Sequence, residues 1–523
     1  MSTLGNKHPE YVDHEEDWRL CRDCFQGERR IKEQGSRYLP PTAGMYMDGY
    51  PNIGTKGTHD YNGYRDRAVF HNFLKKSVLH YMGLLHHKEA TIELPQRMEP
   101  LREKCTRHGE TLLQLLRVIH EELLVTGRLG LYGSMPDTKT TDVLMPYISF
   151  YRAESILNWD EGETDQVDED SLNMLVLDES GPRRKDTFGW DLQIKQYRVL
   201  LLGDPFINEQ NAGVVSANAD RSMLFQDGLF AGDQEFDPAL MDIPNIRGVA
   251  LGRIPFVIIN SKDTQPRPDD PPQLDLANQD ITIYKGEADY RQALHMQAQP
   301  TLCLMGYGSS EESQDGSVDQ PIRTGVGAVI RIPNPAGDAK YVGVDPTGIP
   351  EMRQGLENDV RTAQMMSGSL TDTRTNQKES GDAMGKRMAA ESARLINIAQ
   401  TAAVGLQSLL RIIAEWMGED PLKVVVTPNK EFSFKPLTPA DMNQLQAFKT
   451  AGGPISDESI HTNLVRSGLT DLDYEDEQVK MGEEEPRIDL TGAPVNAPLN
   501  KVQQQAFDHA DERMEMERNG DEE

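Results

Sequence analysis

Apolar residues near the middle of the chain follow helical spacing on both sides of a polar break. Between Glu351 and Met366 they recur every three or four residues, which predicts one stripe along a helix. Across residues 382–417 a heptad pattern, interrupted only by Ser392, predicts a second helix about 54 Å long that Gly418 ends. The heptad positions are 388, 395, 402, 409 and 416, with 392, 399, 406 and 413.

The break itself, residues 367–381, contains two glycines and mostly small polar residues, and it predicts an exposed loop. A long helix preceded by a polar loop and another helix is unusual inside an enzyme. The pattern suggests a spine that presents the loop.

The first half of the chain has helical patterns, followed by short runs typical of strands. Helices are predicted over 13–33, where Gly27 or Gly35 ends the helix, over 67–87 and over 98–126. An irregular, Gly- and Pro-rich segment is predicted over 35–63. The predicted strands are Leu129–Gly133, Pro146–Tyr151, Asn173–Leu177, Tyr197–Leu202 and Arg253–Asn260.

A polar helix is predicted over Leu274–Gln299, after a connector rich in Pro and Asp. Charged residues such as Asp275, Asp280, Lys285 and Glu287 surround it, so it must face water on several sides or pack in a wet assembly. The remaining predicted elements are strands at 301–305, 328–332 and 340–344, a strand pair at 423–427 and 431–435, and helices that begin at Thr438 and Ser456.

Length and charge narrow the possible classes. A chain of 523 residues is expected to form two to four units. The formal net charge is −30, so DNA is either irrelevant or must pass without sticking to the protein. Without a run of ~18 apolar residues, no membrane span is expected, and because the first residues lack an apolar core segment, no signal peptide is expected either. The four cysteines fit a reducing compartment.

The known catalytic and metal-binding motifs are missing from the sequence. It has no phosphate-binding Gly-rich loop ending in Lys-Ser/Thr, no Gly-x-Ser-x-Gly and no four-ligand Cys/His set. Cys21 and Cys24 are interpreted as helix-face cysteines rather than a redox or metal pair. His86 and His87 are interpreted as cations at a helix end, and His120 as satisfied or exposed. We therefore predict no catalytic residue, cofactor or metal; an enzyme using an unpatterned carboxylate pair is the lesser alternative.

A series of short motifs, each weak alone, occurs in order from residue 8 to about 480. They include His8–Tyr11, Gly35–Pro40, Tyr64–Ala68, Gly127–Gly130, Ala153–Trp159, Ile254–Phe256, Leu274–Ala277, Ala288–Leu294, Ser380–Ala383 and Gly453–Ser456. In this order the chain resembles the portal proteins of tailed bacteriophages, and more narrowly a portal-like subfamily long labelled a domain of unknown function. His86-His87-Lys88 departs from the Arg/Lys-rich ending common in that family.

The resemblance implies an α+β portal fold. Its parts would be an α/β wing at 1–260, a stem helix at 261–299, a small β clip at 300–345, a second stem helix at 346–366, a tunnel loop at 367–381, a long helix at 382–418, strands returning to the wing at 419–437, crown-like helices at 438–470 and an acidic, largely disordered tail at 471–523.

The resemblance also implies a function without catalysis: a ring, expected to be a dodecamer, at the capsid vertex of a virion assembled in the host cytoplasm. Its partners would be copies of itself, the major capsid protein, the terminase large subunit, a head–tail adaptor and double-stranded DNA, with no membrane. Another head–tail connector or scaffold component is the alternative.

Three groups of residues would serve this function. The channel loop would present Thr371, Asp372, Arg374, Asn376, Lys378 and Lys386; the stem would contribute Asp275, Asp280, Lys285 and Glu287, and the clip Gly306, Gly325 and Arg331. Arg374, Lys378 and Lys386 would make weak phosphate contacts, or would be ordinary solvated loop charges.

Overall fold

The computed structural model describes most of the chain, and its fold is α+β, as predicted. The described residues are 4–135, 145–161, 172–202, 224–232, 234–246, 249–298, 301–305, 338–342, 346–367, 381–429, 439–466, 470 and 472–483. The backbone alone is described at 161, 193, 301, 302, 304, 339, 341, 342, 346, 381–392, 439–443, 466 and 481–483. The chain comprises two compact units, Met1–Phe432 and Ser433–Glu523.

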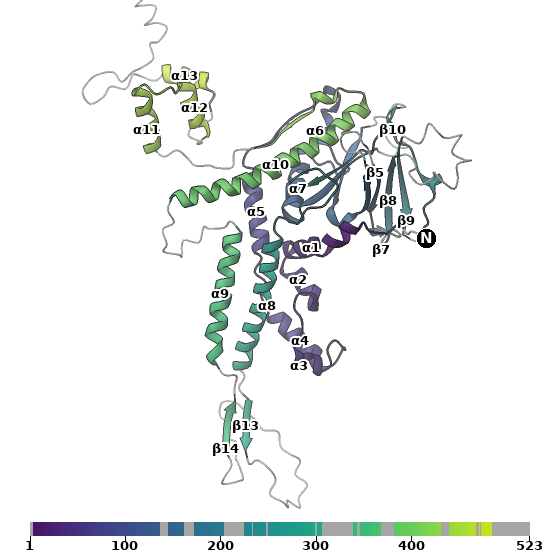
Figure 1. Ribbon diagram of the computed structural model, residues 1–523, viewed down its shortest axis with the longest axis vertical. Coiled ribbons are helices and arrows are strands. Elements are labelled where there is room, and N and C mark those ends of the chain that lie inside the picture. Colours follow the sequence, from purple (N-terminus) through teal and green to yellow (C-terminus); the bar gives the residue numbers. More distant parts are fainter. Residues whose placement is uncertain are drawn as a thin grey trace, which may run out of the picture. The chain divides into compact units, whose positions relative to one another are not determined.

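Helices dominate the first part of unit 1 (Figure 1). They are α1 (Pro9–Gln26), α2 (Glu28–Gln34), α3 (Ala43–Met47), α4 (Lys56–Arg67), α5 (Phe73–Leu85), α6 (Pro100–Glu103) and α7 (Leu112–Val125), with 3-10 turns at Gly35–Arg37 and Gln96–Met98. Gly27, at a φ of 97°, separates α1 from α2 within the predicted 13–33 helix.

Two predictions for this part of the chain were wrong in part. The single helix expected over 98–126 is interrupted, because Thr111 caps a new helix: its Oγ1 accepts from the Gln114 N–H at 3.2 Å, and the Gln114 side chain accepts from the Thr111 N–H. The segment 35–63, expected to be irregular, contains α3 and the first part of α4.

Antiparallel sheets follow the helices. One has the strand order β12-β2-β3 and another the order β4-β5-β8-β9; β6–β7, β10–β11 and β1–β15 are two-stranded. All five strands predicted in this region are present. The bounds are β1 (Thr91–Glu93), β2 (Arg128–Ser134), β3 (Tyr147–Arg152), β4 (Ile156–Glu161), β5 (Leu172–Asp178), β6 (Gly181–Arg184), β7 (Trp190–Ile194), β8 (Gln196–Leu202), β9 (Phe225–Ala231), β10 (Asn245–Ile246), β11 (Val249–Ala250), β12 (Phe256–Asn260) and β15 (Val425–Thr427), with 3-10 turns at Ala153–Ser155, Pro238–Leu240 and Pro421–Lys423.

The long helix α10 (Gly381–Met417) places its heptad stripe in the core of unit 1. Each heptad position with a described side chain is at most 2% exposed: Leu395, Ala399, Ala402, Leu406, Leu409, Ile413 and Trp416. The helix packs on β12, β2, α7 and β15 and ends at Gly418, where φ is 72°. The predicted stripe is therefore confirmed as a packing seam.

One segment of this helix, Ala393–Met417, is long and apolar enough to cross a membrane by length and composition alone. Its apolar window is 61% buried inside the protein, which is the behaviour of a core helix.

The chain after α10 pairs with a strand of the N-terminal part. β15 pairs antiparallel with β1, with Ile92 opposite Val426. The predicted partner strand at 431–435 lies outside the described residues.

Unit 2 contains α11 (Pro439–Thr450), α12 (Asp457–Arg466) and α13 (Tyr474–Glu483). Ser456 precedes α12 as predicted, and its Oγ accepts from the Ser459 N–H at 3.1 Å. The tail was expected to be largely disordered, yet α13 lies within it, and the Tyr474 ring packs on His461 at a centroid distance of 5.4 Å. Residues 484–523 lie outside the described part.

Gly405 tests how closely α10 packs on the sheet. A Cβ there would lie 2.4 Å from the Cγ1 and Cδ1 of Ile259 on β12. We predict that Gly405→Ala lowers the free energy of unfolding by about 1–3 kcal/mol through overpacking. Gly355→Ala is the matched control in an open helical position, with nothing within 4 Å, and it should raise that free energy by about 0.5–1 kcal/mol. Urea unfolding of both variants measures the two effects; equal changes would contradict the packing.

Candidate functional site

Two helices joined through a β ribbon project from the sheet-bearing part of unit 1 (Figure 1). They are α8 (Leu274–Gln297) and α9 (Ile349–Met366), and the ribbon pairs β13 (Thr301–Met305) with β14 (Asp338–Val342) in antiparallel register; the 3-10 turn Pro346–Gly348 precedes α9. The Gln279 side-chain amide donates to the Asp359 carbonyl oxygen at 3.3 Å, so the helices are in direct contact. The third predicted strand, at 328–332, lies outside the described residues.

One face of α8 is buried against the N-terminal helices although the helix is polar overall. Its buried residues are Leu276, Ala277, Asp280, Ile281, Ile283, Tyr284, Glu287 and Ala288. Two predicted stem charges, Asp280 and Glu287, are therefore buried within unit 1, 0% and 7% exposed. The other two, Asp275 and Lys285, are exposed.

Asp280 binds the start of α5. Its carboxylate accepts from the Phe73 N–H at 3.3 Å and the Leu74 N–H at 3.0 Å, two of the N–H groups that a helix leaves unpaired at its N-terminus. Burial raises the pKa of Asp280 to about 7, while the two backbone hydrogen bonds and nearby Lys76 oppose this shift. The side chain thus fixes α8 to α5 at a titratable contact.

Three more residues continue this contact along α8. Glu287 lies 3.0 Å from His71 Nε2 and accepts from Arg291 Nε at 2.7 Å. Tyr64 donates its hydroxyl to Asp289 at 2.6 Å, and Arg67 donates to Gln292. We call Asp280, Glu287, Asp289 and Gln292 the anchoring row: they hold α8 to residues 64–74.

In contrast, α9 is attached on one side only. Of the predicted stripe, Ala363 is buried and Leu356 and Val360 pack on the core, but Met352 and Met366 are each 39% exposed. Met365 is 59% exposed. Among its described residues, Ala363 alone is buried, so most of the helix is open to solvent in the single chain.

The other predicted site residues cannot be placed. Lys386 belongs to α10, where the backbone alone is described. The remainder lie outside the described residues, namely Thr371, Asp372, Arg374, Asn376, Lys378, Gly306, Gly325 and Arg331.

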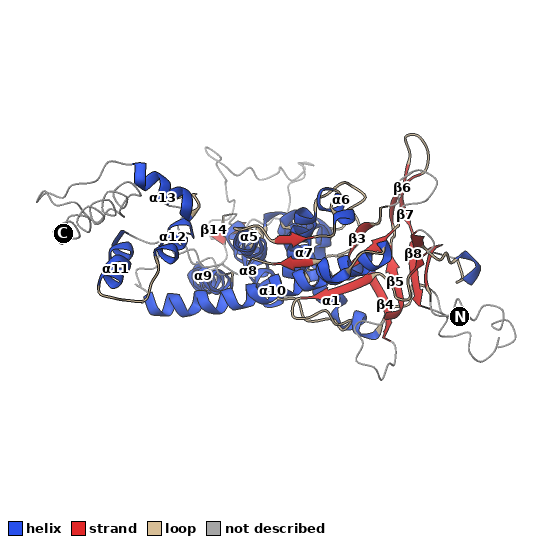
Figure 2. Ribbon diagram, turned by 90° about the horizontal axis from the view of Figure 1, so that it is seen from above, coloured by secondary structure: helices blue, strands red, loops and turns tan. Residues whose placement is uncertain are grey.

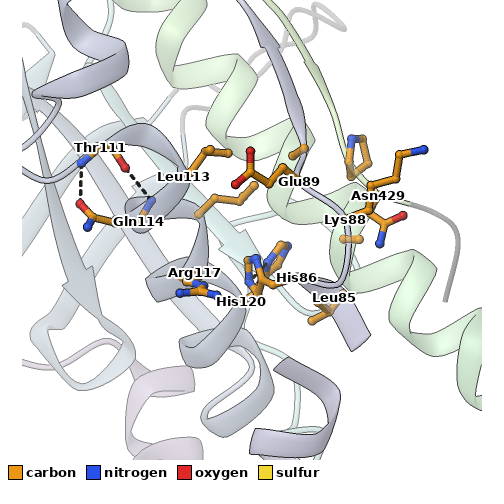
Figure 3. Close-up of a pocket in the computed structure, with 14 residues that line it drawn as sticks. Leu85, His86, Lys88, Glu89, Thr111, Leu113, Gln114, Arg117, His120 and Asn429 are labelled. Carbon is orange, nitrogen blue, oxygen red and sulfur yellow. Dashed lines mark hydrogen bonds between the residues drawn. The ribbon is translucent and has the colours of Figure 1, made fainter. Parts of the chain in front are cut away.

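A cavity of about 280 Å³ lies between α5, α7 and the segment after β15 (Figure 3). Two of its lining rings, His86 and His120, meet with Nε2 and Nδ1 at 3.1 Å. Burial lowers the pKa of His86 to about 4, helped by Arg117, and the pKa of His120 to about 3, helped by His86. His86 is therefore neutral at pH 7, and its interpretation as a helix-end cation was wrong.

Within the described part of the chain, no group of three or more His, Cys, Asp or Glu is placed to hold a metal ion. Cys21 and Cys24 are buried free thiols whose pKa burial raises well above the usual range, which disfavours the reactive thiolate. Their interpretation as helix-face residues is confirmed.

Residues 272–417 match a family model described as "Domain of unknown function (DUF4055)". This range spans α8, the β ribbon, α9 and α10. No curated protein matches the chain.

Solved structures align with most of the chain at low identity. The neck of the native GTA particle computed with C12 symmetry aligns at a TM-score of 0.35 and 12% identity, over 75% of this chain and 89% of that chain. The virion of the native gene transfer agent particle gives 0.35 and 13%, over 82% and 99%. The neck of the empty GTA particle computed with C6 symmetry gives 0.36 and 12%, over 81% and 96%.

The buried carboxyl of Asp280 predicts a pH-dependent stability. Because its pKa is raised in the folded protein, the folded state holds that proton more tightly, and the resulting stability is lost as pH rises from about 4 through about 7. Asp280→Asn cannot titrate, so the wild type should lose up to about 1.4 kcal/mol per pH unit relative to it in this window.

Urea unfolding at several pH values from 5 to 8 measures this difference. Asp275→Asn, at an exposed position one and a half turns away on the same helix, is the control and should run parallel to the wild type. A constant difference between wild type and Asp280→Asn across the range would contradict the burial of the carboxyl.

Proposed function

We propose that this chain is the portal subunit of a tailed-bacteriophage-like particle. Its copies form a closed ring, expected to be a dodecamer, at the vertex of the capsid. The ring surrounds a channel through which viral DNA is packaged and ejected. The ordered sequence motifs between residue 8 and about 480 carry the resemblance on which this proposal rests.

The main structural support is the contrast between α8 and α9. The anchoring row holds α8 to its own subunit, so the pair is a rigid projection. Met352, Met365 and Met366 of α9 are exposed in the single chain, and methionine is common at protein-binding surfaces because its side chain adapts to its partner. A ring with a repeated head-to-tail interface covers such a face in every copy.

The long helix α10 supplies the second support. The helix begins at the end of the segment that follows α9, residues 367–381, and its buried stripe, from Leu395 onward, packs on the sheets of unit 1. In this proposal the segment is the tunnel loop, the β13–β14 region is the clip, and unit 2 provides the crown. Displacement of the loop by DNA would then be transmitted to the core through α10.

The net charge of −30 suits a channel more than a DNA-gripping protein. Tight binding to duplex DNA comes from phosphate neutralisation and counterion release, which an acidic wall opposes. We assign the chain no catalysis of its own. The partners in this proposal are the terminase large subunit and a head–tail adaptor at the clip, and the major capsid protein around the ring.

The direct test of the proposal is the assembly state of the purified full-length protein. We expect negative-stain electron microscopy to show rings with a central hole. Analytical ultracentrifugation should give a mass near the value of about 700 kDa for a dodecamer of 58.7-kDa chains. A globular monomer or dimer at micromolar concentration would contradict the proposal.

Deleting residues 371–378 tests the role of the loop. The deletion leaves α9, which ends at Met366, and the buried stripe of α10, which begins at Leu395, unchanged, so the variant should form rings like the wild type. DNA packaging or retention should fail, as measured by the yield of filled particles when the variant replaces the wild type. A shortening of the acidic tail by eight residues, 516–523, is the matched control. Normal packaging by the loop variant would remove this loop from the channel.

A further inference from the structure

A two-stranded arm projects from the four-stranded sheet, as Figure 2 shows for β6 and β7. It continues the pairing of β5 with β8 outward. Asp178 lies opposite Tyr197, the Glu179 N–H donates to the Gln196 carbonyl at 2.9 Å, and Gly181 lies opposite Ile194. We call residues 181–195 the β6–β7 arm.

The arm carries three large apolar side chains in the open. Phe188 is 92% exposed, Trp190 61% and Leu192 72%. Trp190 and Leu192 are two residues apart on one strand, so they share a face of the ribbon.

The tip of the arm is a defined turn. One carboxylate oxygen of Asp186 accepts from the Phe188 N–H at 2.9 Å and from the Gly189 N–H at 2.6 Å. The Arg184 guanidinium donates to the Thr187 carbonyl at 2.7 Å. These bonds fix the turn that presents Phe188, as expected of a preformed contact element.

An arm of this kind is poorly suited to remain in water. A two-stranded hairpin alone is marginally stable, and within the described part of the chain no third strand pairs with β6 or β7. Exposed apolar clusters with a polar rim mark interaction sites. The arm therefore has the composition of a surface that a partner covers.

Charge indicates which partner covers it. The arm carries four basic residues, Arg183, Arg184, Lys185 and Lys195, against Asp186 and Asp191, a net charge of +2. The whole chain has a net charge of −30, so a second copy presents an acidic surface. Duplex DNA is a poorer partner for the arm than a second copy, because the carboxylates of Asp186 and Asp191 repel phosphates. The exposed apolar side chains would also remain in contact with water beside a charged phosphate backbone.

We propose that the β6–β7 arm docks on a neighbouring copy of this chain, with Phe188, Trp190 and Leu192 buried in the contact and the basic residues facing the neighbour's carboxylates. This inference rests on the proposed ring and deepens it: the arm is one of the contacts that make copies associate head to tail. The same surface would then recur at every interface of the ring.

The test compares Phe188→Ser/Trp190→Ser/Leu192→Ser with wild type by sedimentation velocity over a concentration series. The three side chains are exposed, so the thermal midpoint by circular dichroism should be unchanged. We expect the concentration needed for half-assembly to rise at least tenfold. Ile53→Ser, at a position 99% exposed on the N-terminal part of the chain, is the control and should assemble like wild type.

A second measurement does not depend on assembly yield. Benzoylphenylalanine in place of Phe188 should give covalent dimers of the chain on irradiation, and mapping of the cross-linked peptides should identify an acidic segment of the second copy. Added duplex DNA should not be cross-linked.

The possible results of these two experiments distinguish the arm contact from the proposed portal ring. Wild-type rings together with unchanged assembly of the triple variant and no covalent dimers would overturn the role of the arm while the portal proposal stands. Cross-linking to DNA instead of to a second copy would also overturn it. A wild type without rings, whose arm still cross-links to a second copy, would overturn the portal proposal and retain the arm contact.

Discussion

The attachment of α8 to its own subunit is the constraint on which the rest of unit 1 depends. The buried face of α8 combines apolar residues such as Leu276 and Tyr284 with the carboxylates of Asp280 and Glu287, and apolar packing alone does not fix its position. Asp280 instead accepts two backbone N–H groups of α5, and Asp289 accepts the Tyr64 hydroxyl. Buried polar groups with partners fix one arrangement, because any shift leaves them unpaired. The β ribbon and α9 are carried on this fixed helix.

The second fixed element, α10, is held by shape rather than by polar contacts. Leu406, Leu409 and Ile413 are fully buried, and Gly405 allows the helix to lie against Ile259. In the sequence, α9, which is open on most of its surface, and the segment 367–381 come between these two helices. A rigid frame that holds a lightly covered helix is what an assembling subunit requires, since the uncovered surface can be buried by a neighbour without rearrangement. The β6–β7 arm is a second uncovered surface of the same kind.

Sequence patterns predicted the elements of this fold well where one period dominates. The heptad positions of α10 are compatible only with a helix, and the β-branched run at Phe256–Asn260 only with a strand, because in each case the apolar residues must be buried together. The patterns failed where local chemistry decides, as at Thr111, whose side chain starts a helix inside an apolar run.

The candidate site was predictable only in part. Asp280 and Glu287 were identified as charges of a stem helix, but their burial depends on residues 64–74, about 200 positions earlier in the chain. Spacing within one helix holds no information about such a partner. The exposed Phe188, Trp190 and Leu192 were missed for the opposite reason: alternation predicts a strand but does not indicate whether anything covers it.

The portal proposal requires that α8 and α9 line the channel of a closed ring, and a cryo-EM reconstruction of the assembled full-length protein can show this. The helical pair should surround the central hole in every subunit, with the exposed Met365 of α9 against a neighbour or the hole. A ring with the pair on its outer rim, or a structure without a hole, would contradict it.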